Sequence, residues 1–348
     1  MAYGFGIVGT GMIAGHQARA LKDVSGARLE AVFSRDAARA EAFGGEFNCR
    51  SYSDMNRFLA DDEVSIVSIC TPSGAHLESA LAAAEAGKHL IVEKPLEITL
   101  ERCDRMINAA ERHGVYLGGI FQSRFFDASR VVKDAIDQGR FGRLVLGDAY
   151  VKWFRPQSYY DQGGWKGTLA LDGGGALMNQ SIHAIDLLQW YMGKVDSVQA
   201  YTATLGHERI EVEDTAVATL QFADGAVGVI EGSTAVFPGF LKRVEICGTA
   251  GSAILEEEDL KAWSFSQERP EDQEIRRRYG SATKTGGGAS DPGAIGTEGH
   301  RRQFSDFIDA VDRGKPLALN GIEARKSVAI ILAIYESAAS GRRVPVQG

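Results

Sequence analysis

A glycine-rich segment near the start of the chain has the residue types of a phosphate-binding turn. Residues 9–14 read Gly-Thr-Gly-Met-Ile-Ala, the spacing G-x-G-x-x-A. Between a strand and a helix, Gly9 would allow the turn, Gly11 would let the backbone approach a pyrophosphate, and the final alanine would let helix and strand pack. Met12 and Ile13 would open the helix, whose free N–H groups favour an anion. The segment predicts a dinucleotide site; the alternative is a turn that binds nothing.

The position that usually chooses between NAD and NADP lies about 20 residues further on. Ser34 and Arg35 stand there instead of an acid. A hydroxyl and a guanidinium can bind a 2′-phosphate, which a carboxylate would repel. The pair therefore favours NADP over NAD. Asp36 adjoins it and would cap the next helix.

Two further polar segments each follow a predicted strand. Thr71-Pro72-Ser73 comes first, with His76 shortly after it, and Glu93-Lys94-Pro95 follows the next strand. Ligands of open α/β sheets bind beyond the carboxyl ends of the strands. We expect Thr71, Pro72, His76, Glu93 and Lys94 to line the cofactor site. Lys94 could hold a substrate hydroxyl and transfer a proton; the alternative is a surface lysine paired with Glu93.

A second glycine cluster precedes a histidine. Residues 173–186 read GGGALMNQSIHAID, so that Asn179, His183 and Asp186 would share one face of a helix over 176–192. A histidine there could transfer protons near neutral pH, although a helical histidine is more often structural. Asp186 could orient His183 or anchor the helix.

The segment before this helix, residues 152–168, is rich in aromatic and basic side chains. We expect substrate contact from at least one of Arg155, Tyr160 and Trp165, and Arg124 is a similar candidate at the domain junction. The alternative is a packed crossover loop. The other histidines show no ligand spacing, so no metal site is predicted.

The elements around these segments form two patterns. Strands and helices alternate over residues 1–121, which predicts a doubly wound parallel sheet in a Rossmann domain, residues 1–122. Residues 123–348 predict an α+β domain with a large, mostly antiparallel open sheet, including an Asp-Gly hairpin at 223–226. Residues 280–299 are rich in glycine, serine and threonine, and predict a mobile loop or lid.

Composition excludes several classes of protein. The net charge of −8 argues against a nucleic-acid surface, and Arg276, Arg277 and Arg278, the one triple basic run, are expected in a solvated loop. No apolar run reaches the length of a membrane span. The chain enters an apolar strand at once, without a leader segment, and its four cysteines show no metal-type spacing, so we expect a reduced, cytoplasmic protein.

Together these motifs resemble the Gfo/Idh/MocA family of oxidoreductases over nearly the whole chain. The resemblance rests on residues 9–14, 71–73 and 93–95 and on the segment from Gly173 to Asp186. It implies hydride exchange between NAD(P) and a sugar, cyclitol or related polyol, with Lys94 and His183 as catalytic residues. It also implies a cis peptide before Pro95 and a homodimer or homotetramer through the second-domain sheet.

One position departs from the family pattern. Many members have aspartate where this chain has Asn179, and an amide can orient a hydroxyl but cannot take its proton. Proton transfer then falls to His183 and Lys94, and the sequence leaves open which of them takes it. Two other hypotheses stay open, namely NAD-dependent glycoside hydrolysis within the same family and a non-catalytic nucleotide-binding protein.

Overall fold

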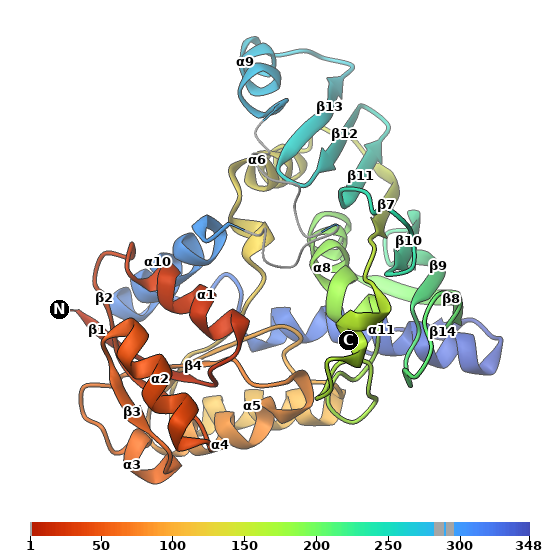
Figure 1. Ribbon diagram of the computed structural model, residues 1–348. Coiled ribbons are helices and arrows are strands. Elements are labelled where there is room, and N and C mark those ends of the chain that lie inside the picture. The colour runs from red at the N-terminus through yellow and green to blue at the C-terminus, as the bar shows by residue number, and fades with distance from the viewer. Residues whose placement is uncertain (1, 282–288, 290–295) are drawn as a thin grey trace. The chain divides into compact units, whose positions relative to one another are not determined.

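The computed structural model describes residues 2–281, 289 and 296–348. The chain forms two compact units, shown with their elements in Figure 1. The first unit comprises Met1–Gln122 and Thr297–Arg325, and the second comprises Ser123–Gly296 and Lys326–Gly348. The loop or lid expected over residues 280–299 lies largely outside the described residues.

The first unit is built on a six-stranded parallel sheet, as the alternation of strands and helices predicts. Its strand order is β3-β2-β1-β4-β5-β6. The register places Phe33, Val8, Ile69, Val92 and Gly119 in one row at the carboxyl ends of five strands. The segments that follow these strands therefore leave the same edge of the sheet. The strands are β1 (Tyr3–Val8), β2 (Ala27–Phe33), β3 (Arg50–Tyr52), β4 (Ile66–Ile69), β5 (His89–Val92) and β6 (Leu117–Gly119).

Three of the helices between these strands, α2, α3 and α5, begin where a short polar side chain caps them. The Asp36 carboxylate accepts from Arg39 N, and the Thr99 hydroxyl accepts from Arg102 N. The Asp54 carboxylate caps the third helix, accepting from Arg57 N at 2.9 Å. The helices are α1 (Met12–Leu21), α2 (Ala37–Phe47), α3 (Met55–Leu59), α4 (His76–Glu85) and α5 (Leu100–His113).

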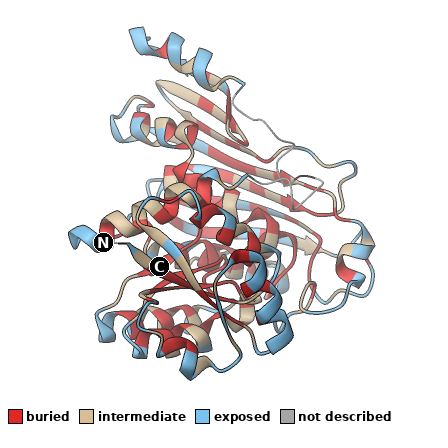
Figure 2. Ribbon diagram, turned by 60° about the vertical axis from the view of Figure 1, so that its left-hand side comes forward, coloured by how far each residue is buried: buried red, intermediate tan, exposed pale blue. Residues whose placement is uncertain are grey.

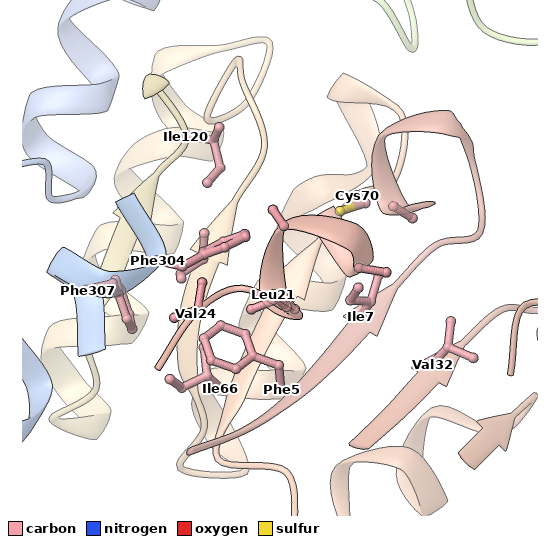
Figure 3. Close-up of a cluster of buried hydrophobic side chains, with 14 of the residues drawn as sticks. Phe5, Ile7, Leu21, Val24, Val32, Ile66, Cys70, Ile120, Phe304 and Phe307 are labelled. Atoms are coloured by element: carbon pink, nitrogen blue, oxygen red, sulfur yellow. The ribbon is translucent and has the colours of Figure 1, made fainter. Parts of the chain in front are cut away.

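A late segment of the chain completes the core of the first unit. Helix α10 (Glu298–Arg313) packs against α1, and its Phe304 and Phe307 join Phe5, Ile66 and other side chains in one buried cluster (Figure 3). Sequence analysis assigned residues 123–348 to the second domain, whereas Thr297–Arg325 pack with the first unit. The reason is the apolar face of α10, which the strong amphipathic spacing of its phenylalanines creates.

The second unit is built on an eight-stranded open sheet, in the order β13-β12-β11-β7-β10-β9-β8-β14. Every neighbouring pair is antiparallel except β7 and β10. The predicted Asp-Gly turn joins β9 to β10, and Gly225 has the positive φ of +91° that such a turn needs. The strands are β7 (Leu144–Lys152), β8 (Val195–Ala203), β9 (Thr215–Phe222), β10 (Val227–Ser233), β11 (Arg243–Gly248), β12 (Gly251–Glu256), β13 (Asp259–Phe265) and β14 (Val344–Pro345).

Helices of the second unit differ from the predictions at two places. The helix expected over 176–192 is a π-helix over Ala176–Ser181, followed by α8 (Ile182–Met192). The arginine run at 276–278 lies in helix α9 (Pro270–Tyr279), not in a loop, because Pro270 and a capping box start a helix there. The remaining helices are α6 (Asp127–Asp137), α7 (Gln157–Asp161) and α11 (Gly321–Ser340), which passes from the first unit into the second.

Burial alternates along the strands of this sheet, as expected for a sheet with one covered face. In β9, every second residue from Ala216 to Phe222 is buried. Figure 2 shows the strands mainly in red and tan and the outer helices with pale blue surfaces. On the opposite face, Tyr201 pairs with Val217 and Leu146 with Val227, and all four side chains are exposed. No helix among the described residues is long and apolar enough to cross a membrane.

Candidate functional site

The glycine turn after β1 has the geometry that a dinucleotide requires. Gly9 has φ +112°, and a Cβ there would lie 2.8 Å from the carbonyl oxygen of Cys70. Gly11 is the N-cap of α1, and a Cβ there would meet no atom within 4 Å. Neither a capping side chain nor an acidic residue occupies the first turn of α1. The N–H groups at this helix start are therefore available to an anion, so the residues present fit a bound pyrophosphate.

The segment after β2 carries the side chains expected to distinguish NADP from NAD. Arg35 is exposed, and the Ser34 hydroxyl accepts from Asp36 N at 3.3 Å. Asp36 caps α2, as predicted, so its carboxylate is bound to that helix. Of Ser34 and Arg35, only Arg35 carries a charge, and its guanidinium is exposed.

The ends of β4 and β5 are joined by His76. Its Nδ1 lies 3.0 Å from the carbonyl oxygen of Pro95, and its Nε2 lies 3.0 Å from that of Thr71. The ring is buried and ties the Thr-Pro-Ser segment to the Glu-Lys-Pro segment. Direct contact of His76 with a cofactor stays a prediction, while its contacts here are with the main chain. The peptide between Lys94 and Pro95 is cis, which confirms the prediction.

Glu93 is buried beside the lysine, and both of its oxygens accept from protein groups. Oε1 accepts from Gln17 Nε2 at 2.6 Å, and Oε2 accepts from the Lys94 backbone N–H at 3.1 Å. His300 Nε2 lies 3.5 Å from Oε1, an electrostatic contact at the limit of a hydrogen bond. Burial raises the pKa of Glu93, but His300, Lys94 and Gln17 together lower it below its usual value. The carboxylate is therefore held in its ionised form.

Sequence analysis missed the partners of Glu93. Gln17, Ser68, His16 and His300 lie with it in the interior of the first unit, yet we set both histidines aside for want of ligand spacing. Among the described residues, no group of three or more histidine, cysteine, aspartate or glutamate side chains could hold a metal ion. The sequence signal that could have indicated these partners is Gln17, a polar residue on the apolar face of α1, where it is wholly buried. A buried amide implies a polar partner.

In the second unit, the glycine cluster allows a crowded approach to the π-helix. A Cβ on Gly175 would lie 1.7 Å from the carbonyl oxygen of Glu213. The Glu213 carboxylate accepts from Gly175 N at 2.8 Å, from Leu177 N at 2.9 Å and from the Tyr335 hydroxyl at 3.0 Å. Burial raises the pKa of Glu213 to about 6, against the lowering effect of these donors.

The predicted face of Asn179, His183 and Asp186 is interrupted by the change from π- to α-helix. Asn179 lies in the π-helix and donates to Asp172 Oδ1 at 2.7 Å, while His183 lies in the first turn of α8. Asp172 also accepts from Gly167 N at 2.9 Å. Sequence analysis missed Asp172, which fixes the direction of the Asn179 amide.

Asp186 and Arg124 form a buried ion pair. Arg124 donates from Nε to Oδ2 at 2.7 Å and from Nη2 to Oδ1 at 2.6 Å, a bidentate geometry. The guanidinium also lies over the Trp190 ring. Of the two roles considered for Asp186, anchoring α8 is the one these contacts support. Substrate contact is no longer the role that we propose for Arg124.

The aromatic and basic loop divides into packed and accessible members. Tyr160 is buried, its hydroxyl pairs with Thr234 Oγ1 at 3.0 Å, and burial raises its pKa to about 12. Trp165 is half-buried. The neighbouring Tyr159, which the sequence did not single out, lies beside two cations. Lys166 Nζ is 3.8 Å and the Arg155 guanidinium 5.7 Å from its ring centre.

These two cations have different surroundings. Arg155 is buried and donates from Nη1 to the carbonyl oxygens of Phe154 and Ala289. The pKa of Lys166 lies below its usual value, mainly because of burial. The charge of Asp172 opposes this lowering, and the charge of Arg155 adds to it. Asp172, which influences the pKa of Lys166, also accepts from Asn179, so this carboxylate links the basic loop to Asn179.

Family models match both parts of the chain. Residues 3–120 match "Oxidoreductase family, NAD-binding Rossmann fold", and residues 129–254 match "GFO/IDH/MocA C-terminal domain". Among solved structures, the WlbA dehydrogenase from Bordetella pertussis in complex with NADH and UDP-GlcNAcA is 33% identical, with a TM-score of 0.89, over 100% of this chain and 98% of the other. Its counterpart from Chromobacterium violaceum, also in complex with NADH and UDP-GlcNAcA, is 34% identical, with a TM-score of 0.88, over 99% of this chain and 96% of the other.

A curated relative with a different substrate matches at lower identity. Myo-inositol 2-dehydrogenase of Thermotoga maritima is 27% identical over 98% of this chain and 98% of its own length. The likeness thus extends over whole chains and includes dehydrogenases that act on dissimilar polyols.

Proposed function

The chain belongs to the Gfo/Idh/MocA family of oxidoreductases, and from that premise we propose that it transfers a hydride between a nicotinamide cofactor and a hydroxyl-bearing carbon of a sugar, cyclitol or related polyol. The observation that carries this proposal is the row of strand ends in the first unit. Val8, Ile69 and Val92 are register neighbours, so the glycine turn and the segment with Lys94 leave one edge of the sheet. A lysine beside a dinucleotide turn can meet the hydroxyl that is oxidised.

The cofactor would be held by groups of the first unit. The N–H groups at Gly11, Met12 and Ile13 would face the pyrophosphate, and the remaining predicted contacts follow β2, β4 and β5. When bound, the nicotinamide accepts or returns the hydride. The further contacts that we propose are those of Ser34, Arg35, Thr71, Pro72, His76, Glu93 and Lys94.

Proton transfer is the task of the chain's own side chains. We propose that Lys94 and His183 hold the substrate hydroxyl and remove its proton, and that they polarise the carbonyl in the reverse direction. Asn179, whose amide nitrogen donates to Asp172, would orient a neighbouring hydroxyl of the substrate by hydrogen bonding.

The test replaces each proposed catalytic residue and separates turnover from cofactor binding. Lys94→Ala and His183→Asn should each lower kcat by about 10²- to 10⁴-fold, with the cofactor dissociation constant changed by less than about threefold. Exposed residues provide matched controls, Lys22→Ala and His113→Asn, which should leave kcat unchanged. Undiminished turnover in Lys94→Ala would remove that lysine from the mechanism.

We further propose that the substrate carries a carboxylate or phosphate. Arg155 and Lys166 place two positive charges around Tyr159, beside Asn179. Guanidinium and ammonium groups bind such anions, and the aromatic ring offers a face for a sugar. The likeness to dehydrogenases solved with UDP-GlcNAcA, an acidic nucleotide sugar, supports the same class.

A panel of paired substrates tests this class directly. Uronates, nucleotide-linked uronates and their neutral counterparts should differ in kcat/KM in favour of the acids. Lys166→Met should raise KM for the acids by about 10-fold and leave neutral sugars unaffected. Lys152→Met is the control, because Lys152 is paired with Glu231 on the sheet. Equal activity on acidic and neutral sugars would contradict the proposal.

A further inference from the structure

A buried chain of polar side chains connects the first helix to the segment that carries Lys94. The Ser68 hydroxyl on β4 donates to Gln17 Oε1 at 2.5 Å, and Gln17 Nε2 on α1 donates to Glu93 Oε1 at 2.6 Å. His300 on α10 faces the same oxygen. All four side chains are at most 5% exposed. Three elements far apart in the sequence therefore meet at one carboxylate.

An ionised carboxylate in this position is expensive for the fold. Burial of a charge costs several kcal/mol unless close partners compensate it, and an apolar side chain of similar volume would often serve stability as well or better. The partners here are Gln17, His300 and the Lys94 backbone N–H. A buried charge kept in this way points to a purpose beyond packing.

Other charged and titratable groups around Glu93 are consistent with its ionised state. His16 on α1 stacks edge-on against His300, with ring centres 4.8 Å apart. The thiol of Cys70, after β4, is fully buried, and burial together with the charge of Glu93 raises its pKa well above the usual value. The groups facing Glu93 are thus His300, with His16 behind it, Lys94 and Cys70.

The geometry at Glu93 links this network to Lys94. One carboxylate oxygen takes Gln17 and faces His300, and the other takes the Lys94 backbone N–H. If Oε1 lost its partners, the carboxylate could rotate and release that N–H. The position of the Lys94 backbone, from which its side chain departs, therefore depends on α1 and α10.

We propose that His300 and Gln17 are positioning residues, which act through Glu93 to hold Lys94 in the orientation needed for proton transfer. This inference rests on the proposed function of Lys94. It adds one residue from α1 and one from α10, a helix that follows Ser123–Gly296 in the sequence, to the machinery at the end of β5.

The experiment compares His300→Leu, which removes the polar contact, with His300→Gln, which retains an N–H donor. His300→Leu should lower kcat by about 10- to 100-fold while the cofactor dissociation constant stays within about threefold of the wild-type value. His300→Gln should keep most of the wild-type turnover. Equal losses in both variants, or parallel losses of kcat and cofactor binding, would indicate a merely structural role and overturn the proposal.

A second measurement does not depend on turnover. In protein labelled with ¹⁵N-lysine, the Lys94 amide signal, assigned by its absence in Lys94→Arg, reports the protonation of Glu93. Without His300 the pKa of Glu93 should rise, so the signal should titrate at a pH about one unit higher in His300→Leu than in the wild type. An unchanged titration would overturn the proposal even if kcat falls.

The two measurements separate this proposal from the proposed reaction. If the wild type oxidises no sugar on the panel but the Lys94 amide titrates as expected, the network holds Lys94 and the proposed reaction is wrong. If turnover depends on Lys94 but neither kcat nor the amide responds to His300→Leu, the reaction stands and the positioning role is wrong. Gln17→Leu repeats the test from α1, in case His300→Leu does not fold.

Discussion

Single residues in this protein often have a specific role that depends on one neighbour. Asn179 is directed by Asp172, Lys94 by Glu93, and Asp186 is bound by Arg124. The sequence indicated Lys94 and Asn179, because motif spacing identifies them, but it could not indicate Asp172 or His300. The partner of His300 is distant in sequence, so only the fold brings it to Glu93. Asp172 lies near Asn179 in the sequence but belongs to no motif that spacing identifies.

Tyr159 and Tyr160 show the same limit between adjacent residues. Either tyrosine could have faced a substrate, and sequence analysis chose Tyr160. The structure buries Tyr160 against His207 and places Tyr159 between Lys166 and Arg155. Which neighbour points inward depends on the backbone of the short helix α7, and no side-chain property of tyrosine could predict it.

Arg35 tests the preference for NADP. Arg35→Ala should raise the dissociation constant for NADP about 10-fold or more, because it removes a charge-assisted hydrogen bond to the 2′-phosphate, and should change that for NAD by less than about twofold. Isothermal titration with both dinucleotides measures the two constants.

Arg39→Ala is the control. Arg39 is also exposed, but it lies within helix α2, beyond the Asp36 cap. Solved relatives hold NADH, so the dissociation constants for NAD and for NADP are both worth measuring. Equal weakening of both dinucleotides in Arg35→Ala would contradict a role in selecting the phosphate.

Glu213 makes stability depend on pH. Its folded pKa of about 6 lies above the ordinary value of 4.5. A carboxyl whose pKa is raised by folding stabilises the native state at low pH, and this contribution is lost as the pH rises from about 4.5 through about 6. The loss amounts to about 2 kcal/mol of unfolding free energy.

The measurement is the unfolding midpoint of the wild type and Glu213→Gln as a function of pH. Glutamine cannot ionise, so the wild type should lose stability relative to the variant across that interval, whatever the other carboxyl groups contribute to both. Parallel curves for the two proteins would show that Glu213 does not titrate there.

At the level of elements, the sequence predicted most of the fold correctly. The alternation in residues 1–121 and the Asp-Gly turn indicated the parallel sheet and the hairpin, because both depend on local spacing. The π-helix at Ala176–Ser181 was not predictable from that spacing. It arises where Glu213, from a distant segment, binds the N–H groups of Gly175 and Leu177.

The entry to this π-helix should be intolerant of a side chain. Gly175→Ala should destabilise the protein by about 1–3 kcal/mol or reduce the yield of folded protein, because its Cβ would collide with the Glu213 backbone. Gly45→Ala is the control in helix α2, where a Cβ meets nothing within 4 Å; that change should be neutral or stabilising by about 0.5–1 kcal/mol. Thermal unfolding of both variants checks the pair, and similar midpoints would contradict the expected collision.

At the level of the whole molecule, the open sheet offers a surface for assembly. Tyr201, Val217, Val227 and Leu146 are exposed on one face of four neighbouring strands. Exposed apolar side chains on one face of a sheet are typical of an interface, and they support the homodimer or homotetramer that we propose.

Val217→Asp should reduce the mass of the protein in light scattering after gel filtration, because a charge buried at an interface has no partner. Leu205→Asp is the control, because Leu205 is an exposed apolar residue outside the strands, and it should leave the mass unchanged. A Val217→Asp variant with the mass of the wild type would place the interface elsewhere, as would a monomeric wild type.

Helix α10 gives the molecule a further property, which concerns the order of synthesis. Phe304, Phe307 and Leu317 belong to the buried cluster that also contains Phe5 and Ile66. During translation, the first 122 residues emerge long before these side chains exist. The nascent dinucleotide-binding unit therefore keeps part of its apolar core uncovered until nearly the whole chain has left the ribosome. A fragment cut at residue 122 would remain permanently in that condition, because only a chain that extends through α10 and Leu317 contains every side chain of this core.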